Sequence, residues 1–284
     1  MYLGGNGFYW KVAVSDNWPD AVEIRRGEGG IRAWASDPGE YYNAFDGEYG
    51  GLWRRNGRAP QVLAGVGFTS QGDHYGAPYK RTHESYSDEW AWVFEGISEE
   101  IIGNFGLSGG GAAGFELDRA DTMLGTPLNA VTLASSEGHD ESFVLVPEDI
   151  LTHHDTWPHK PVKDLIRADI VYFETAKGGG VFSVGSITFC GSLPHNKCEN
   201  NISIKIAPVK RILIKALGKP AITISIALRN TCPYNTRFSL NPLERAVMTY
   251  CNPIWSINEF FVSRVKVAKP VTTEAVMGST MCHR

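Results

Sequence analysis

The chain has 284 residues, of which 43% are hydrophobic, and a formal net charge of −4, a composition typical of a globular protein with a core of its own. No run of about 18 or more apolar residues occurs and no basic-then-apolar segment follows Met1, so the sequence predicts neither a membrane span nor a secretory signal. Five cysteines without CxxC spacing argue against a disulfide framework and a zinc knuckle, and we expect a reducing, cytoplasmic setting.

The first element in chain order is the stretch LGGNGFYW, Leu3–Trp10. It is typical of the carboxyl end of a buried strand that turns sharply into a helix, the place where open α/β sheets bind their ligands. A parallel sheet needs partner strands, and none precedes this one. We therefore expect that the amino-terminal strands of the domain are missing from the chain.

The remaining elements are predicted from alternation and from turn residues. Residues 89–102 fit both a strand and a helix and stay undecided, whereas 40–57 is typical of an ordered surface excursion. The last block, residues 161–193, has the pattern of the last strands of an α/β sheet. The other expected elements are strands at 11–15, 21–26, within 60–70 and at 129–138, a glycine-rich loop before a short strand or turn within 103–121, a short helix within 161–169, the strand Ile170–Glu174, and two strand segments separated by Gly185.

Asn6 is the first candidate for chemistry. A side-chain amide at such a turn can donate a hydrogen bond to a developing oxyanion, beside free backbone N–H groups. The alternative is that Asn6 only tolerates a turn with positive φ, since GGNG is a turn signal in any protein.

Glu116 is the second candidate, within GGGAAGFELDRAD. Between Phe115 and Leu117 its carboxyl could lie in a partly apolar pocket, where burial would raise its pKa and suit it to general acid–base catalysis. The alternative is a surface glutamate beside Asp118 and Arg119. The glycines before it are not a phosphate-binding loop, because no Gly-Lys-Ser/Thr follows.

Two histidine clusters could bind a divalent metal through imidazole and carboxylate groups. Neither has the i, i+4 spacing of HExxH, so loop positions are the alternative, and the individual roles stay open. A serine or cysteine nucleophile is poorly supported, since the central residue of the Leu3–Trp10 turn is Asn6, which cannot act as the nucleophile. The clusters contain Glu137, His139, Asp140 and Glu141 in the first, and His153, His154, Asp155 and His159 in the second.

Six stretches together resemble the C-terminal domain of the large (β) subunit of N,N-dimethylformamidase, and the resemblance covers residues 1–203. The stretches are MYLGGNGFYW, EIRRGEGGIRAW, GEYGGLWRRNGRAPQVLAGVGFTSQG, FGLSGGGAAGFELDRAD, LASSEGHDESF and GGGVFSVGSITFCGSLPHN.

The resemblance implies a hydrolase that splits N,N-dimethylformamide into formate and dimethylamine. It implies an α/β fold, a class I glutamine amidotransferase-like open sheet with β-rich insertions that lacks the amidotransferase cysteine. It also implies a mononuclear iron bound by two tyrosines and a glutamate, which would act as a Lewis acid. We expect those ligands upstream of Met1, so none is assigned here. Asn6 and Glu116 match the family motifs as catalytic residues, and a small (α) subunit is the implied partner.

Beyond residue 203 the family pattern stops, and 204–284 is not expected to form an independent domain. Residues 197–284 carry 13 Lys and Arg against 4 Glu and no Asp, whereas 1–196 carry 14 against 27 Asp and Glu. Three origins are open for the tail 204–284. It could be the translation of a wrong reading frame or of a retained non-coding segment, a genuine basic tail, or an unrelated fused module. Prolines at short intervals, among them Pro220, Pro233, Pro242, Pro253 and Pro270, interrupt its apolar residues and argue against a separate core.

Three functions compete. The first is a piece of a dimethylformamidase-like amide hydrolase, inactive by itself because it lacks the family's metal ligands. The second is a non-catalytic, amidotransferase-like module for assembly or ligand binding. The third makes the basic tail a binder of nucleic acid or membrane, and it ranks last because aromatic–basic interleaving is sparse there.

Overall fold

The computed structural model describes residues 1–27, 40–106, 109–150, 158–193 and 200–204. All of them belong to one compact unit, Met1–Ala221. The predictions for the tail beyond residue 204, and for His153, His154 and Asp155, fall outside the described residues.

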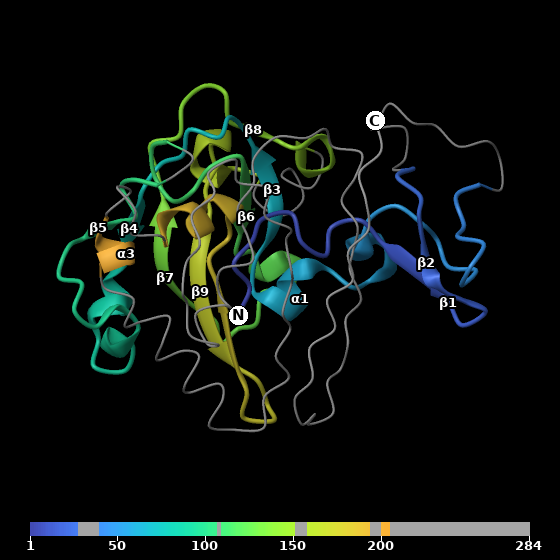
Figure 1. Ribbon diagram of the computed structural model, residues 1–284, viewed down its shortest axis with the longest axis horizontal. Helices are drawn as coiled ribbons and strands as arrows, with labels where there is room; N and C mark the ends of the chain where they lie inside the picture. The colour runs from blue at the N-terminus through green and yellow to red at the C-terminus, as the bar shows by residue number, and fades with distance from the viewer. Residues whose placement is uncertain (28–39, 107–108, 151–157, 194–199, 205–284) are drawn as a thin grey trace, which may run out of the picture. The chain divides into compact units, whose positions relative to one another are not determined.

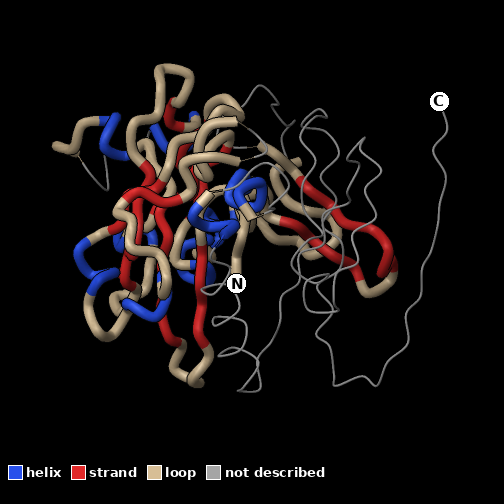
Figure 2. Tube along the Cα trace, turned by 60° about the vertical axis from the view of Figure 1, so that its left-hand side comes forward, coloured by secondary structure: helices blue, strands red, loops and turns tan. Residues whose placement is uncertain are grey.

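Strands and short helical turns make up the regular structure of these residues, as Figures 1 and 2 show. The strands are β1 (Val12–Ser15), β2 (Trp18–Ile24), β3 (Gly67–Gln71), β4 (Tyr79–Arg81), β5 (Ile101–Ile102), β6 (Glu116–Arg119), β7 (Val131–Ser136), β8 (Val144–Leu145), β9 (Asp169–Glu174) and β10 (Gly180–Ser183). The helical elements are α1 (Pro60–Ala64), α3 (Asn201–Ile204) and the 3₁₀ turns η1 (Trp53–Asn56), η2 (His83–Tyr86), η3 (Ala91–Phe94), η4 (Thr122–Leu124), η5 (Val162–Leu165) and η6 (Ile187–Ser192).

The strands form three sheets, and every named strand pair is antiparallel. The largest sheet has the order β10-β9-β7-β4-β5, the second has the order β6-β3-β8, and β1 pairs with β2 as a separate hairpin. Two isolated parallel bridges occur in the described part, Tyr2 with Ser183 and Gly76 with Gly110.

The expected α/β fold is therefore wrong, and so is the amidotransferase-like open sheet. Parallel strands need crossover connections of about a dozen residues or more, usually helices, whereas β9 and β10 are joined by the short hairpin 175–179 and α1 has only five residues. The described chain is a β-rich fold of antiparallel sheets (Figure 2).

The error has a physical source in β9. Its first five residues are buried, and the four from Ile170 to Phe173 form a continuous apolar run like that of a parallel strand covered on both faces. Ile170 packs in the main core and Val171 in a second cluster with Ala64 and Val66. Burial of both faces of an antiparallel strand thus produces the pattern that we attributed to the last strands of an α/β sheet.

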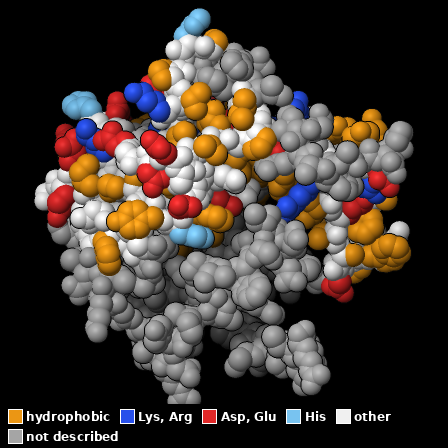
Figure 3. All heavy atoms as spheres, turned by 90° about the horizontal axis from the view of Figure 1, so that it is seen from above, with side chains coloured by type: hydrophobic (Ala, Val, Ile, Leu, Met, Phe, Trp, Pro, Cys, Tyr) orange, Lys and Arg blue, Asp and Glu red, His pale blue; other side chains and the backbone are white. Residues whose placement is uncertain are grey.

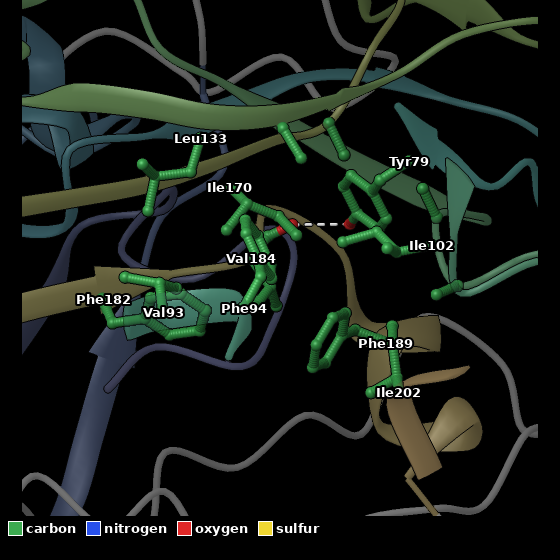
Figure 4. Close-up of a cluster of buried hydrophobic side chains, with 14 of the residues drawn as sticks. Tyr79, Val93, Phe94, Ile102, Leu133, Ile170, Phe182, Val184, Phe189 and Ile202 are labelled. Carbon is green, nitrogen blue, oxygen red and sulfur yellow. Dashed lines mark hydrogen bonds between the residues drawn. The ribbon is translucent and has the colours of Figure 1, made fainter. Parts of the chain in front are cut away.

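The main core lies against the five-stranded sheet and includes eighteen buried residues. Figure 4 shows Tyr79 of β4 pointing toward Val184, with the bond from its hydroxyl to the Val184 carbonyl at 2.5 Å. Phe189 of η6 lies near that pair, and its ring centroid is 6.2 Å from that of Tyr79. The sequence 187–192 was expected to be a strand, but it folds as η6, which supplies Phe189 to the core.

Several other local predictions are confirmed. Strands occur where 11–15, 21–26, 129–138 and 170–174 predicted them, and a short strand follows the glycine-rich loop. The undecided stretch 89–102 contains η3 and β5, and 60–70 begins with α1 before β3. The helix expected after Leu3–Trp10 does not form. Trp10 bridges to Leu52 and β1 follows.

On the face that Figure 3 shows, hydrophobic side chains are interspersed with acidic and basic ones over the described residues. Among these residues no helix has both the length and the apolar character needed to cross a membrane.

Candidate functional site

The turn that carries Asn6 begins at the edge of the five-stranded sheet. The Tyr2 backbone N–H donates to the Phe182 carbonyl at 2.8 Å, and the Val184 N–H donates to the Tyr2 carbonyl at 3.1 Å. The chain then reverses through Asn6, whose φ is 61°, a left-handed conformation that asparagine tolerates better than most residues. A Cβ at Gly5 would lie 2.9 Å from the Glu116 carbonyl oxygen, so only glycine fits this approach.

Glu116 is the first residue of β6, an edge strand of the three-stranded sheet. Phe115 before it has a φ of 60°, and its carbonyl accepts a hydrogen bond from the Gly72 N–H at 2.8 Å. Because side chains alternate along a strand, Glu116 and Asp118 project from the same face of β6. The exposed His74 imidazole stacks on Phe115, with the ring centroids 4.2 Å apart.

Three hydrogen bonds join residues 2–7 to β6, and a fourth lies within those residues. The Asn6 side-chain Nδ2 donates to Glu116 Oε1 at 2.9 Å, and the Asn6 backbone N–H donates to Asp118 Oδ1 at 2.8 Å. The Tyr2 hydroxyl donates to Asp118 Oδ2 at 2.7 Å, and it accepts from the Gly7 N–H at 2.7 Å. We call Tyr2, Asn6, Glu116 and Asp118 the Asn6 cluster. Asn6 and Glu116, selected separately from the sequence, therefore lie in direct contact, while their catalytic role stays a prediction.

Burial sets the electrostatics of this cluster. It raises the pKa of the Glu116 carboxyl to about 7, against the lowering effect of the Asn6 amide donor. It raises the pKa of the Asp118 carboxyl to about 8, against the donors from Asn6 and Tyr2. Burial, followed by the nearby Asp118 carboxylate, raises the pKa of the Tyr2 hydroxyl well above its usual value. A carboxyl with a pKa near neutrality is suited to proton transfer.

The two carboxyls differ in access. Asp118 is fully buried, whereas Glu116 is only partly buried, so Glu116 is the more accessible of the two side chains. Asn6 Oδ1 has no hydrogen-bond partner among the described residues, so the cluster contains one acceptor that lacks a donor. A bound water or substrate group could supply that donor.

The sequence reasoning missed Tyr2 and Asp118. For Asp118 a signal existed, since an acidic residue two positions after Glu116 in a predicted strand must share its face. Nothing local marks Tyr2, because its role depends on pairing with Ser183, far away in the sequence.

The Asn6 cluster does not fit the iron that the family resemblance implies. Both Asp118 oxygens and the Tyr2 hydroxyl are engaged with each other and with the turn. The described part of the chain also holds no group of three or more His, Cys, Asp or Glu residues able to bind a metal ion. We therefore derive no chemical step through iron.

The histidine clusters have other contacts where they are described. His139 Nε2 lies 2.7 Å from Ser136 Oγ, and burial lowers the pKa of its imidazole to about 4. Asp140 accepts hydrogen bonds from Ser142, and Glu137 lies 3.5 Å from the Lys80 ammonium. The contacts of the first cluster therefore go to its own loop, to the end of β7 and to Lys80 of β4.

Comparison with known proteins agrees with this reading of the motifs. A family model described as "N,N-dimethylformamidase beta subunit-like, C-terminal" matches residues 1–200. The N,N-dimethylformamidase beta subunit of an Alcaligenes species is 40% identical over 227 residues, 78% of this chain and 29% of the relative. That of Paracoccus aminophilus is 42% identical over 208 residues, 72% of this chain and 26% of the relative. This chain thus spans less than a third of the length of these curated relatives, and it belongs to the N,N-dimethylformamidase beta subunit-like family through the C-terminal part of that subunit.

Proposed function

We propose that this chain supplies part of the active site of an amide hydrolase that acts on small N-substituted amides, with dimethylformamide as the first substrate to test. The observation that carries the proposal is the hydrogen bond from Asn6 to Glu116, a partly exposed carboxyl whose pKa is raised to about 7. The names of the relatives support the reaction class.

Hydrolysis of an amide needs one proton removed and one delivered. The Glu116 carboxylate would take a proton from water as the water oxygen forms its bond to the carbonyl carbon. The resulting Glu116 carboxylic acid would give that proton to the amine nitrogen as the C–N bond breaks, leaving a carboxylic acid, which loses its own proton to solvent, and an amine. A pKa near 7 allows one group to perform both steps at neutral pH.

Asn6 would hold Glu116 in place for these transfers. Its Nδ2 donor stabilises the carboxylate form, and its unpartnered Oδ1 could accept a hydrogen bond from the attacking water. The backbone bond from Asn6 to Asp118 fixes the direction of the amide.

The rest of the active site would lie outside the described residues. Iron enters this proposal only through the family resemblance, as does a small partner subunit, although the word "beta" in the relatives' names supports a multi-subunit enzyme. We accordingly expect no dimethylformamide hydrolysis by the 284-residue chain alone. The cytoplasmic location also stays a prediction.

The test is a chimera in which residues 1–200 of this chain replace the matching stretch of the Paracoccus aminophilus beta subunit. The chimera should release formate from dimethylformamide. Glu116→Gln in the chimera should lower kcat by about 10²–10⁴-fold, the usual contribution of a general base. The matched control Glu89→Gln changes an exposed glutamate and should leave the rate within about two-fold.

The competing hypothesis is a non-catalytic module for assembly or ligand binding. It predicts that a folded chimera binds the remaining subunit but that Glu116→Gln leaves kcat unchanged. That result, in a chimera with measurable activity, would refute the role of Glu116.

A further inference from the structure

We propose that Tyr2 and Asp118 are positioning residues for the Asn6–Glu116 pair, joined through the backbone of the Asn6 turn. The inference rests on the proposed function for its catalytic meaning, but its structural content concerns contacts that can be tested without turnover.

The geometry of Asp118 supports this assignment. Its side chain is fully buried, and its two oxygens accept from different segments, Oδ1 from the Asn6 backbone N–H and Oδ2 from the Tyr2 hydroxyl. Its own backbone N–H donates to the Gly185 carbonyl at 2.7 Å, just after β10. Asp118 therefore joins the three-stranded sheet, the five-stranded sheet and the turn at a single residue.

Tyr2 links β10 to both Asp118 and the Asn6 turn. Its backbone is bonded to β10, while its hydroxyl donates to Asp118 and accepts from the Gly7 N–H. The ring lies against the turn so closely that a Cβ at Gly7 would be 2.7 Å from its Cε2, and one at Gly4 would be 3.3 Å away. The residues on either side of Asn6 are thus packed on one phenol ring.

These contacts determine the direction of the Asn6 amide. The left-handed conformation of Asn6 is strained for most residues and persists only where the surroundings enforce it. The bonds to Asn6 N–H and Gly7 N–H provide that restraint. If the Tyr2 hydroxyl is lost, the turn relaxes and the Asn6 Nδ2 donor moves away from Glu116.

The measurable consequence is a change in the pKa of the Glu116 carboxyl. The Asn6 donor lowers the pKa of this carboxyl against the rise caused by burial, so weakening that donor must raise the pKa further. The titratable groups that face Glu116 in the described structure are Asp118 and, through it, Tyr2. Tyr2→Phe leaves both carboxyls in place and removes only the hydroxyl.

The experiment follows the Glu116 side-chain carboxyl by ¹³C NMR titration in the full chain. Asn6→Gly removes the amide and fits the positive φ, and it should raise the Glu116 pKa by about one. Tyr2→Phe should raise it in the same direction. The double variant should show no further rise beyond Asn6→Gly, because Tyr2 acts through Asn6.

Tyr9→Phe is the matched control. Tyr9 also donates from a buried hydroxyl to a buried carboxyl, Glu148 Oε2, at 2.7 Å, but it does not contact Asn6 in any described bond. This variant should lose stability and leave the Glu116 titration unchanged.

Two results would overturn the proposal. The first is a Glu116 pKa that is unchanged by Tyr2→Phe. A double variant in which the Glu116 pKa rises by the full sum of the two single changes would count equally against the proposal. The second needs no variant: the wild-type Asn6 and Gly7 backbone amides should exchange slowly with solvent, and rapid exchange would show that Asp118 and Tyr2 do not hold the turn. Neither readout depends on hydrolysis, so failure here is distinct from an inactive chimera.

Discussion

Glu116→Gln should change how the stability of the protein depends on pH. The folded chain holds the Glu116 proton up to a pKa of about 7, whereas the ordinary pKa of an unfolded glutamate is 4.5. Because the folded state binds this proton more tightly, the contribution is fully present below pH 4.5 and is lost as pH rises through about 7. The loss corresponds to about 3 kcal/mol at most, reduced by the partial exposure of the side chain.

The assay is urea denaturation at about pH 5 and about pH 8, with the free energy of unfolding extrapolated to water at each pH. Wild-type protein should be less stable at the higher pH. Glu116→Gln should shrink that difference by about 2–3 kcal/mol, since glutamine does not ionise. Glu89→Gln, an exposed control, should leave it unchanged. Identical pH dependence in wild type and Glu116→Gln would refute the argument that burial holds this carboxyl protonated.

Three further predictions follow from other buried groups. His139, with an imidazole pKa lowered to about 4 by burial, should remain neutral at about pH 5.5 in a proton NMR titration; a midpoint near its ordinary value would contradict this. Tyr9→Phe removes a donor from the buried Glu148 carboxyl and should cost about 1–3 kcal/mol by urea denaturation, so a negligible loss would contradict the bond. Gly185→Ala places a Cβ 2.5 Å from the Asp118 carbonyl oxygen at a φ of 67°. It should lower the free energy of unfolding by at least about 1 kcal/mol more than Gly138→Ala, where φ is also positive but the space is open. Equal thermal stability of the two variants would contradict the close packing.

The sequence by itself located most of the local structure. Alternation identified β1 and β7, a short apolar run identified β9, and the glycines around Asn6 marked the sharp turn, because these signals depend on neighbouring residues only. The same reasoning selected Asn6 and Glu116, which the structure joins by a hydrogen bond. Their motifs were sufficient because each residue stands in an unusual local setting.

Tertiary structure alone decided the direction of the strands and the support of the site. The apolar run of β9 does not reveal whether its neighbours are antiparallel strands or the parallel strands of a sheet covered by helices, since both bury the two faces of the strand. Likewise, Asp118 carries no sequence mark of its bonds to Tyr2 and Asn6, which lie more than a hundred residues away. Hydrogen bonds between distant segments depend on how the sheets pack, so no local pattern could have specified them.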